Sequence, residues 1–157
     1  MASAASTLAA IERAMVRIRR SQTRRTLGRL ATRDLGDAVD LAQLDAVLAV
    51  DEGPEQPGQE VTVGLVAERL GVDPSRASRL VAAAIRAGHL RRVASQADGR
   101  RIHLETTDAG REVAEAAHRA RQALYDRLMR DWSQRDRREF ARLLGRFTDA
   151  LTDAGRT

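Results

Sequence analysis

The sequence of 157 residues contains no cysteine, no lysine and few aromatic residues. Without cysteine, the chain has no disulfide, no thiolate zinc site, no cysteine nucleophile and no thiol-based redox sensor. Aromatic residues make up 3% of the chain and hydrophobic residues 43%, so a core must consist mainly of aliphatic side chains. That composition favours packed helices over a β-sandwich. All 27 basic residues are arginine, as a GC-rich bacterial coding sequence would produce.

Long apolar runs and catalytic motifs are also missing. No stretch of about 18 apolar residues could span a membrane, and residues 1–8 lack the basic-then-apolar order of a signal peptide, so a cytoplasmic protein is expected. The chain has no glycine-rich phosphate loop, no Ser/His/Asp arrangement and no HExxH helix. Its three histidines, His89, His103 and His118, form no i, i+4 pair. We therefore expect neither an enzyme nor a bound metal or cofactor.

The formal net charge of +5 is unevenly distributed along the chain. Residues 1–33 carry +7, residues 34–75 carry −9, residues 76–101 carry +6 and residues 102–157 carry +1. Two basic blocks therefore flank an acidic one, a pattern that solubility alone does not require.

Hydrophobic periodicity predicts a mainly α-helical chain. The first helix, over residues 3–31, has a narrow apolar stripe typical of a seam between packed helices, which indicates a partner helix. Residues 51–60 contain two prolines, two glycines and four acids and form a surface connection within one domain. The other helices are predicted from their start signals to begin at Asp40 and Thr62, to cover 74–87 and 109–131, and to begin again at Ser133.

A tight turn joins two of these helices into a helix-turn-helix. Asp73 followed by Pro74 is an N-cap with proline at the first helical position. Arginine can donate two hydrogen bonds to guanine, and serine hydroxyls reach phosphates or base edges. A solvated surface is the simpler interpretation of this helix alone, but the adjoining hairpin and the basic block favour DNA reading. The candidate contacts, all off the apolar stripe in the first turn and a half, are Ser75, Arg76, Ser78 and Arg79.

After Gly88 the hydrophobic period changes towards two, which predicts a β-hairpin. Residues 89–95 and 101–106 are its strands, and Asp98-Gly99 is the turn signal between them. The fold class is therefore mainly α with a small β-hairpin wing. A two-stranded hairpin is not stable alone, so we expect it to lie on the preceding helices.

The hairpin carries a second group of candidate DNA contacts. Arg100 and Arg101 lie at the tip of a projecting ribbon, which can enter a minor groove where a narrow width deepens the negative potential. Arg91 and Arg92 in the first strand are candidates for phosphate contacts.

This arrangement resembles the MarR family of winged helix-turn-helix regulators. The family's wing pattern is Asp-x-Arg, followed after a short strand by Leu-Thr-x-x-Gly at the start of the next helix. Thr106 stands where the family usually has leucine, and residues 67–93 are similar to the family's reading helix and the segment after it. The resemblance covers residues 40–150. The counterparts of the wing pattern are Asp98, Arg100, Thr107 and Gly110.

The resemblance implies a homodimer held by N- and C-terminal dimerisation helices, with two reading helices in successive major grooves of a pseudo-palindromic site. Family members usually repress transcription, and many release DNA when they bind a small molecule. By the same resemblance, Arg100 is the minor-groove arginine and Asp98 braces the wing.

The implied organisation is a dimerisation helix in residues 1–39, the DNA-binding region in 40–110 and further dimerisation helices in 111–157, all in one compact domain. A ligand pocket would lie between the dimer helices and the reading domain. The candidate lining residues are Met15, Leu44, Tyr125 and Trp132. For each of them, packing in the core is the competing interpretation.

Two alternatives stay open. A winged helix can serve protein interaction after losing DNA binding, although such a protein should lack the arginines of the reading helix and wing. The basic block at the N-terminus either contacts DNA through Arg24 or Arg25 or pairs across the dimer with the acidic segment 34–75.

Overall fold

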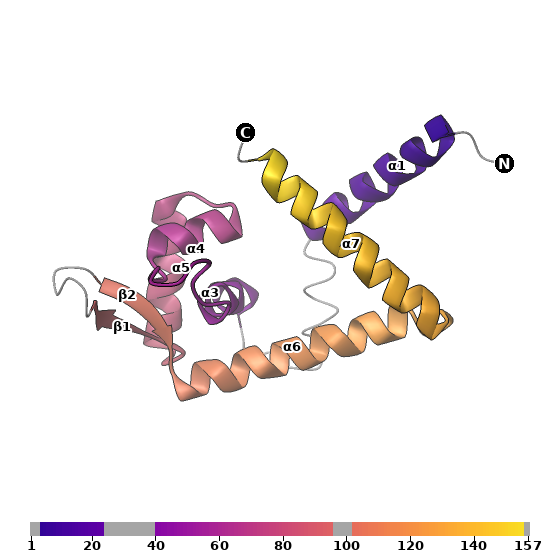
Figure 1. The fold of residues 1–157 in the computed structure, drawn as a ribbon. Helices are drawn as coiled ribbons and strands as arrows, with labels where there is room; N and C mark the ends of the chain where they lie inside the picture. Colours follow the sequence, from indigo (N-terminus) through magenta and orange to yellow (C-terminus); the bar gives the residue numbers. More distant parts are fainter. Residues whose placement is uncertain (1–3, 24–39, 96–101, 156–157) are drawn as a thin grey trace. The chain divides into compact units, whose positions relative to one another are not determined.

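The computed structural model describes residues 4–23, 40–95 and 102–155 (Figure 1). The chain divides into two compact units, Met1–Arg121 and Gln122–Thr157, and α6 runs from the first into the second. No helix in the described ranges is long and apolar enough to cross a membrane. The elements are α1 (Ala4–Thr23), α3 (Leu41–Asp51), α4 (Val63–Leu70), α5 (Pro74–Arg86), β1 (Leu90–Ala94), β2 (Ile102–Thr106), α6 (Asp108–Leu128) and α7 (Gln134–Ala154).

Four helices begin at the capping residues that the sequence predicts. The side-chain oxygens of Asp40, Thr62, Asp73 and Ser133 each accept a hydrogen bond from a backbone amide two or three residues later. Such caps satisfy amide groups that have no partner inside the helix. Helix α4 ends at Gly71, whose φ of 60° lies in the left-handed region that favours glycine.

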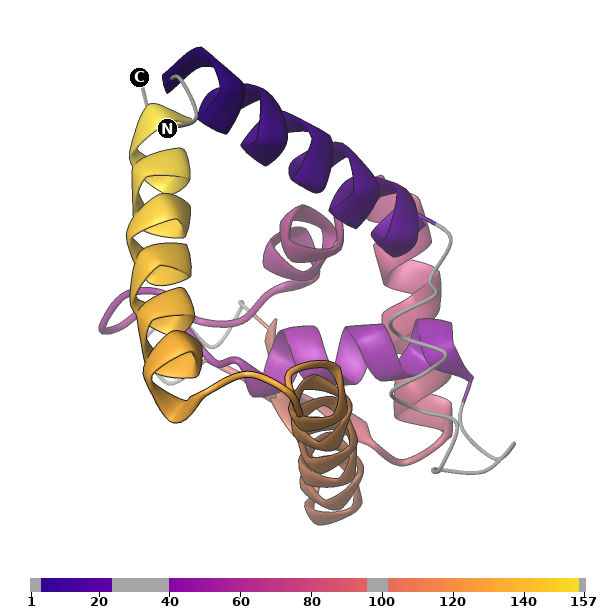
Figure 2. The same cartoon turned by 90° about the vertical axis from the view of Figure 1, so that its right-hand side faces the viewer.

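The core of the first unit lies where α3, α4 and α5 pack against one another and against the hairpin (Figures 1 and 2). Helix α3 is its central element, because its second half is almost entirely buried. Ala77 and Ala84 of α5 are fully buried, and their small side chains allow a close approach between helices. Leu90 and Leu104 complete the core from the two strands. The buried residues of the described ranges include no aromatic side chain, as the composition led us to expect.

The wing is held by backbone hydrogen bonds between its own two strands and by one to the segment before α4. Strands β1 and β2 pair antiparallel, with Leu90 opposite Thr106 and Arg92 opposite Leu104. The segment before α4 adds a further backbone contact, because the Leu104 amide donates to the Val61 carbonyl at 2.8 Å. This contact was not predicted from the sequence. It gives the two-stranded sheet part of the support that such a hairpin needs.

Arg69 holds the end of α3 and the loop after it against α4. Its guanidinium donates to the carbonyls of Ala49 at 2.6 Å and Gly53 at 2.7 Å. Its Nε lies 3.5 Å from a carboxylate oxygen of Glu52 and 3.7 Å from one of Glu55, and its side chain is only 11% exposed. One cation therefore binds both the carbonyls near the end of α3 and the acids of the loop. These polar contacts hold the loop in place, because the loop itself has little apolar surface to bury.

Further details concern the first helix and the buried faces of α4 and α6. Residues 24–31, the predicted end of the first helix, lie outside the described residues. On α4 the buried residues are Leu65, Val66 and Ala67. On α6, Ala114 and Ala117 belong to the core, whereas Leu128 is 58% exposed. The reason is that the core of the first unit extends along α6 only as far as Ala117.

Candidate nucleic-acid interface

Helix α5 has one buried face and one exposed face. The buried face consists of Ala77, Val81 and Ala84, which pack into the core. Most of its exposed side chains lie in the first half of the helix. Backbone amides there have no partner within the helix, and they favour a bound anion. The four predicted reading-helix residues all lie on this exposed surface: Ser75, Arg76, Ser78 and Arg79.

Asp73 organises the start of this helix. Its Oδ1 accepts a hydrogen bond from the Arg76 amide at 2.8 Å and another from the Ser75 hydroxyl at 2.5 Å. The Ser75 hydroxyl, followed by the Arg76 amide, holds the pKa of Asp73 below its ordinary value. The Ser75 hydroxyl therefore donates to the cap, and only its oxygen lone pairs are available to an incoming group.

The Thr-x-x-Gly segment fastens the end of α5 to the start of α6. The Thr107 hydroxyl donates to the Gly88 carbonyl at 2.6 Å and accepts from the Gly110 amide at 3.0 Å. The Thr107 amide donates to the His89 carbonyl at 3.0 Å. Because β1 begins at Leu90, these three bonds also set the direction in which the wing leaves the reading helix.

The two arginines of β1 lie on opposite faces of the wing, since neighbouring strand residues alternate. Arg92 lies opposite Leu104, and Arg91 lies opposite Glu105. Both arginines are exposed. The predicted tip residues Asp98, Arg100 and Arg101 lie outside the described residues, so their placement stays a prediction.

Glu105 is a wing residue that was not singled out from the sequence. Its Oε2 accepts from Arg91, at 3.1 Å from Nε and 2.6 Å from Nη2, and its Oε1 lies 3.1 Å from His103 Nε2. Hydrogen bonding by Arg91 first, and by His103 second, holds the pKa of Glu105 below its ordinary value. Strand alternation alone could not identify Glu105, because the pairing depends on the register between the strands.

The four candidate ligand-pocket residues lie in different surroundings. Leu44 is 2% exposed and belongs to the core of the first unit. Met15 of α1 is 37% exposed. In the second unit, Trp132 contacts Phe140 edge to face, with ring centroids 5.3 Å apart, and Tyr125 is 48% exposed. The structure therefore places Leu44 in a packed core and leaves the other three on described surfaces.

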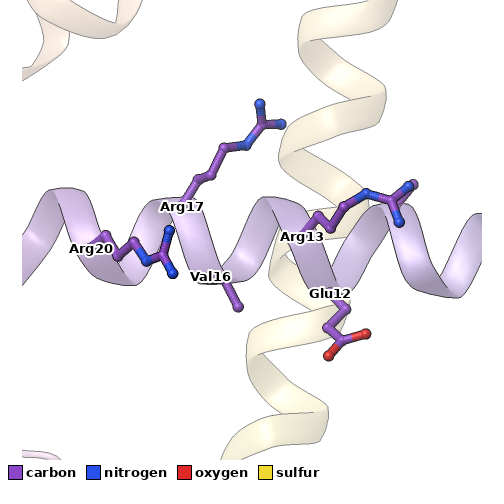
Figure 3. A pocket seen from close by; sticks show the side chains of 6 residues that line it. Glu12, Arg13, Val16, Arg17 and Arg20 are labelled. Atoms are coloured by element: carbon purple, nitrogen blue, oxygen red, sulfur yellow. The ribbon is translucent and has the colours of Figure 1, made fainter.

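Two hollows on the described surface are lined by residues other than these four candidates. One is formed by side chains of α1 alone, with Arg13, Arg17 and Arg20 around it (Figure 3). A single helix cannot enclose a ligand, so this hollow is a concavity of the helix surface. The other, with a volume of about 190 Å³, has Leu48 and Arg121 in its lining.

A comparison with models of known protein families shows what this arrangement is similar to. A family model described as MarR family matches residues 39–101, the range that contains α3, α4, α5 and β1 and ends just before β2. This part of the chain is similar to the MarR family. The match agrees with the predicted resemblance over the region that was expected to bind DNA. A comparison with curated proteins gives no match.

Several solved structures, a MarR family protein among them, have a similar fold. A MarR family protein from Bacillus stearothermophilus is 20% identical, with a TM-score of 0.75 over 96% of this chain and 99% of the other. FabT of Streptococcus pneumoniae, solved in complex with DNA, is 19% identical, with a TM-score of 0.66 over 90% and 98% of the two chains. S. aureus MepR, solved with ethidium bromide, is 16% identical, with a TM-score of 0.58 over 83% and 91%. These likenesses confirm the mainly helical fold with a two-stranded wing.

Proposed function

We propose that this chain is a MarR-family, sequence-specific DNA-binding regulator that binds a pseudo-palindromic operator as a homodimer and represses transcription. The exposed face of α5 carries the proposal. It presents two arginines and two serines on a helix whose opposite face is fixed in the core. Arg76, Ser78 and Arg79 are the donors on this face, whereas the Ser75 hydroxyl, which donates to Asp73, can only accept. Donors on a helix that is fixed in position suit base reading in a major groove.

Each side chain on this face has a chemical role in the proposal. Arg79 and Arg76 donate to guanine edges or phosphates, and Ser78 bonds a phosphate or a base edge. The wing supplies the second contact through Arg91, Arg92, and the tip residues Arg100 and Arg101, with Asp98 bracing the tip. FabT, which shares the fold, is known in complex with DNA, and this supports the assignment of the same partner here.

A second copy of the chain is the proposed partner of the apolar stripes on the terminal helices. On α1 the residues Leu8, Ile11 and Ile18 are 68%, 47% and 44% exposed. On α7 five large apolar side chains are exposed by 39% to 53%, and none of the described residues of α7 is buried. Stripes at helical spacing on both terminal helices suit helix packing between two copies. The stripe of α7 consists of Phe140, Leu143, Leu144, Phe147 and Leu151.

Release of DNA by a small molecule is the proposed form of control. MepR, a structural relative, is known with ethidium bromide bound. Met15, Tyr125 and Trp132, each 37% to 48% exposed, are the proposed contacts for such a molecule in the dimer.

The competing function is a winged helix that binds proteins and no longer binds DNA. Fluorescence anisotropy with a labelled duplex from the region upstream of the gene separates the two, measured over a series of salt concentrations. A regulator releases counterions from several phosphates, so its affinity falls steeply as salt rises. A chain that stays folded and shows no DNA binding at low salt contradicts the regulator.

A further inference from the structure

Four charged or titratable side chains form a connected row on one face of the wing. His103 lies between Glu60, at the end of the loop before α4, and Glu105 on its own strand. Glu105 in turn holds Arg91 from the neighbouring strand. In the part of the chain that the structure describes, these are the charged groups that face His103 directly or through Glu105.

The histidine ring is oriented so that each nitrogen faces a carboxylate. Nε2 lies 3.1 Å from Glu105 Oε1, and Nδ1 lies 3.6 Å from Glu60 Oε1. Nδ1 is buried and has no hydrogen-bond partner in the structure. A neutral imidazole has a hydrogen on only one nitrogen, whereas the protonated ring has one on each. The protonated ring therefore presents a donor to both acids, whereas the neutral ring presents a donor to only one of them.

The two nitrogens point to different acids, so the three side chains do not surround a common point. In agreement with this, the described residues include no group of three that could hold a metal ion. The ligand that fits His103 is a proton.

We propose that His103 is a proton-binding site that controls whether Arg91 is available to DNA. This inference rests on the proposed DNA-binding function. When His103 is neutral, Glu105 is the partner of Arg91 and keeps its guanidinium at the wing surface. When His103 gains a proton, it takes a larger share of the Glu105 charge and repels Arg91.

Exposure decides which cation leaves the carboxylate. The Arg91 side chain is 61% exposed, and that of His103 only 16%. Arg91 can swing into solvent or onto a phosphate, whereas His103 is held between two acids. Protonation therefore strengthens DNA binding by releasing one arginine on each wing. An exposed pair of this kind changes affinity roughly threefold, and two wings in a dimer change it roughly tenfold.

The test is the affinity of the full chain for a fluorescein-labelled mixed-sequence duplex at low salt, from about pH 8 to about pH 5.5, the range where histidine changes charge. The wild type should bind roughly tenfold more tightly at the lower pH, and His103→Gln should lose that gain. His118→Gln is the matched control, because His118 on α6 also lies 3.6 Å from an acid, Asp51, and should keep the gain. A His103→Gln protein with the wild-type pH dependence overturns the proposal.

The Arg91→Ala variant distinguishes two explanations of the pH dependence. Either protonation releases Arg91, or the positive charge on His103 itself attracts DNA. If protonated His103 merely attracts phosphate, Arg91→Ala keeps the pH dependence, and the proposal is wrong. If Arg91 is the released group, the pH dependence disappears with it. Folding of each variant is checked by circular dichroism at both ends of the pH range.

A readout without DNA keeps this proposal distinct from the proposed function. In NMR spectra of the free protein, the Arg91 Nε–H signal should shift with the same midpoint as the His103 ring, and should stay still in His103→Gln. If the Arg91 signal does not change as His103 gains its proton, the proposed control of Arg91 by His103 is wrong. If the two signals change together but the chain binds DNA at no pH, the control of Arg91 by His103 is supported and the proposed DNA-binding function is contradicted.

Discussion

Gly110 lies directly against the carbonyl group of His89. A Cβ atom at Gly110 would overlap the His89 carbonyl oxygen and lie 2.9 Å from its carbonyl carbon. Both neighbours are backbone atoms, so a side chain here cannot be accommodated by a rotamer change. The contact brings the first turn of α6 onto the turn that leads from the reading helix into the wing.

Gly110→Ala is expected to destabilise the fold by about 1–3 kcal/mol, because the added methyl group forces the backbone apart. Urea unfolding followed by circular dichroism measures the change. Gly145→Ala on α7 is the matched control: a Cβ atom there would meet no neighbour within 4 Å, and alanine favours a helix more than glycine does. Equal stability of Gly110→Ala and the wild type would contradict the close contact.

Thr107→Val keeps the shape of the side chain and removes its hydroxyl. Two hydrogen bonds are lost, one to the Gly88 carbonyl and one from the Gly110 amide. The expected cost is about 1–2 kcal/mol, as for the loss of a helix cap. Thr107→Ser retains the hydroxyl and should lie close to the wild type in urea unfolding. If valine and serine behave alike, the hydroxyl is not what joins the two helices.

Arg79→Ala is expected to weaken DNA binding by about 1–3 kcal/mol if Arg79 contacts a base, because a bidentate contact is lost. Anisotropy titration measures the affinity, and sedimentation should show an unchanged oligomeric state. Arg119→Ala removes an exposed arginine from α6 and should leave the affinity close to the wild type. Arg100→Ala on the wing should also weaken binding without changing dimerisation. Unchanged affinity in both Arg79→Ala and Arg100→Ala would refute the proposed contacts.

Leu144→Glu is expected to shift the chain from dimer towards monomer by at least about tenfold in dissociation constant. The reason is that it places an unpaired charge in an apolar stripe that the second copy would bury. Sedimentation velocity over a dilution series measures the shift. Arg146→Glu lies two residues further on, on the other side of α7, and should dimerise as the wild type does. A Leu144→Glu protein that dimerises normally excludes α7 as an interface.

Asp73 gives the stability a defined dependence on acid pH. Its pKa in the folded chain is lowered from 3.8 by the Ser75 hydroxyl and the Arg76 amide, so its ionised form is favoured by folding. The stabilisation is therefore complete above pH 3.8 and is lost as the pH falls through the lower folded pKa. Asp73→Ala should be less stable than the wild type near pH 6, and the two should converge in strong acid. Asp131→Ala, at an exposed site outside any cap, serves as the control in the same urea titrations.

Much of the candidate site could be predicted because its determinants are local. The four caps join residues only two or three positions apart, so a short stretch of sequence specifies each of them. The exposed face of α5 follows from helical periodicity in the same way, and its four candidate residues lie where the periodicity predicts.

The remaining features join residues far apart in the chain, and only the tertiary structure decided them. Arg69 reaches back to Ala49, Leu104 pairs with Val61, and Thr107 binds Gly88. None of these contacts follows from periodicity, because each depends on how whole elements pack and on the register of the strands. The position of His103 between two acids has the same origin. The sequence by itself thus determined the elements and the exposed face of α5, whereas packing decided how the wing is held and which charges meet on it.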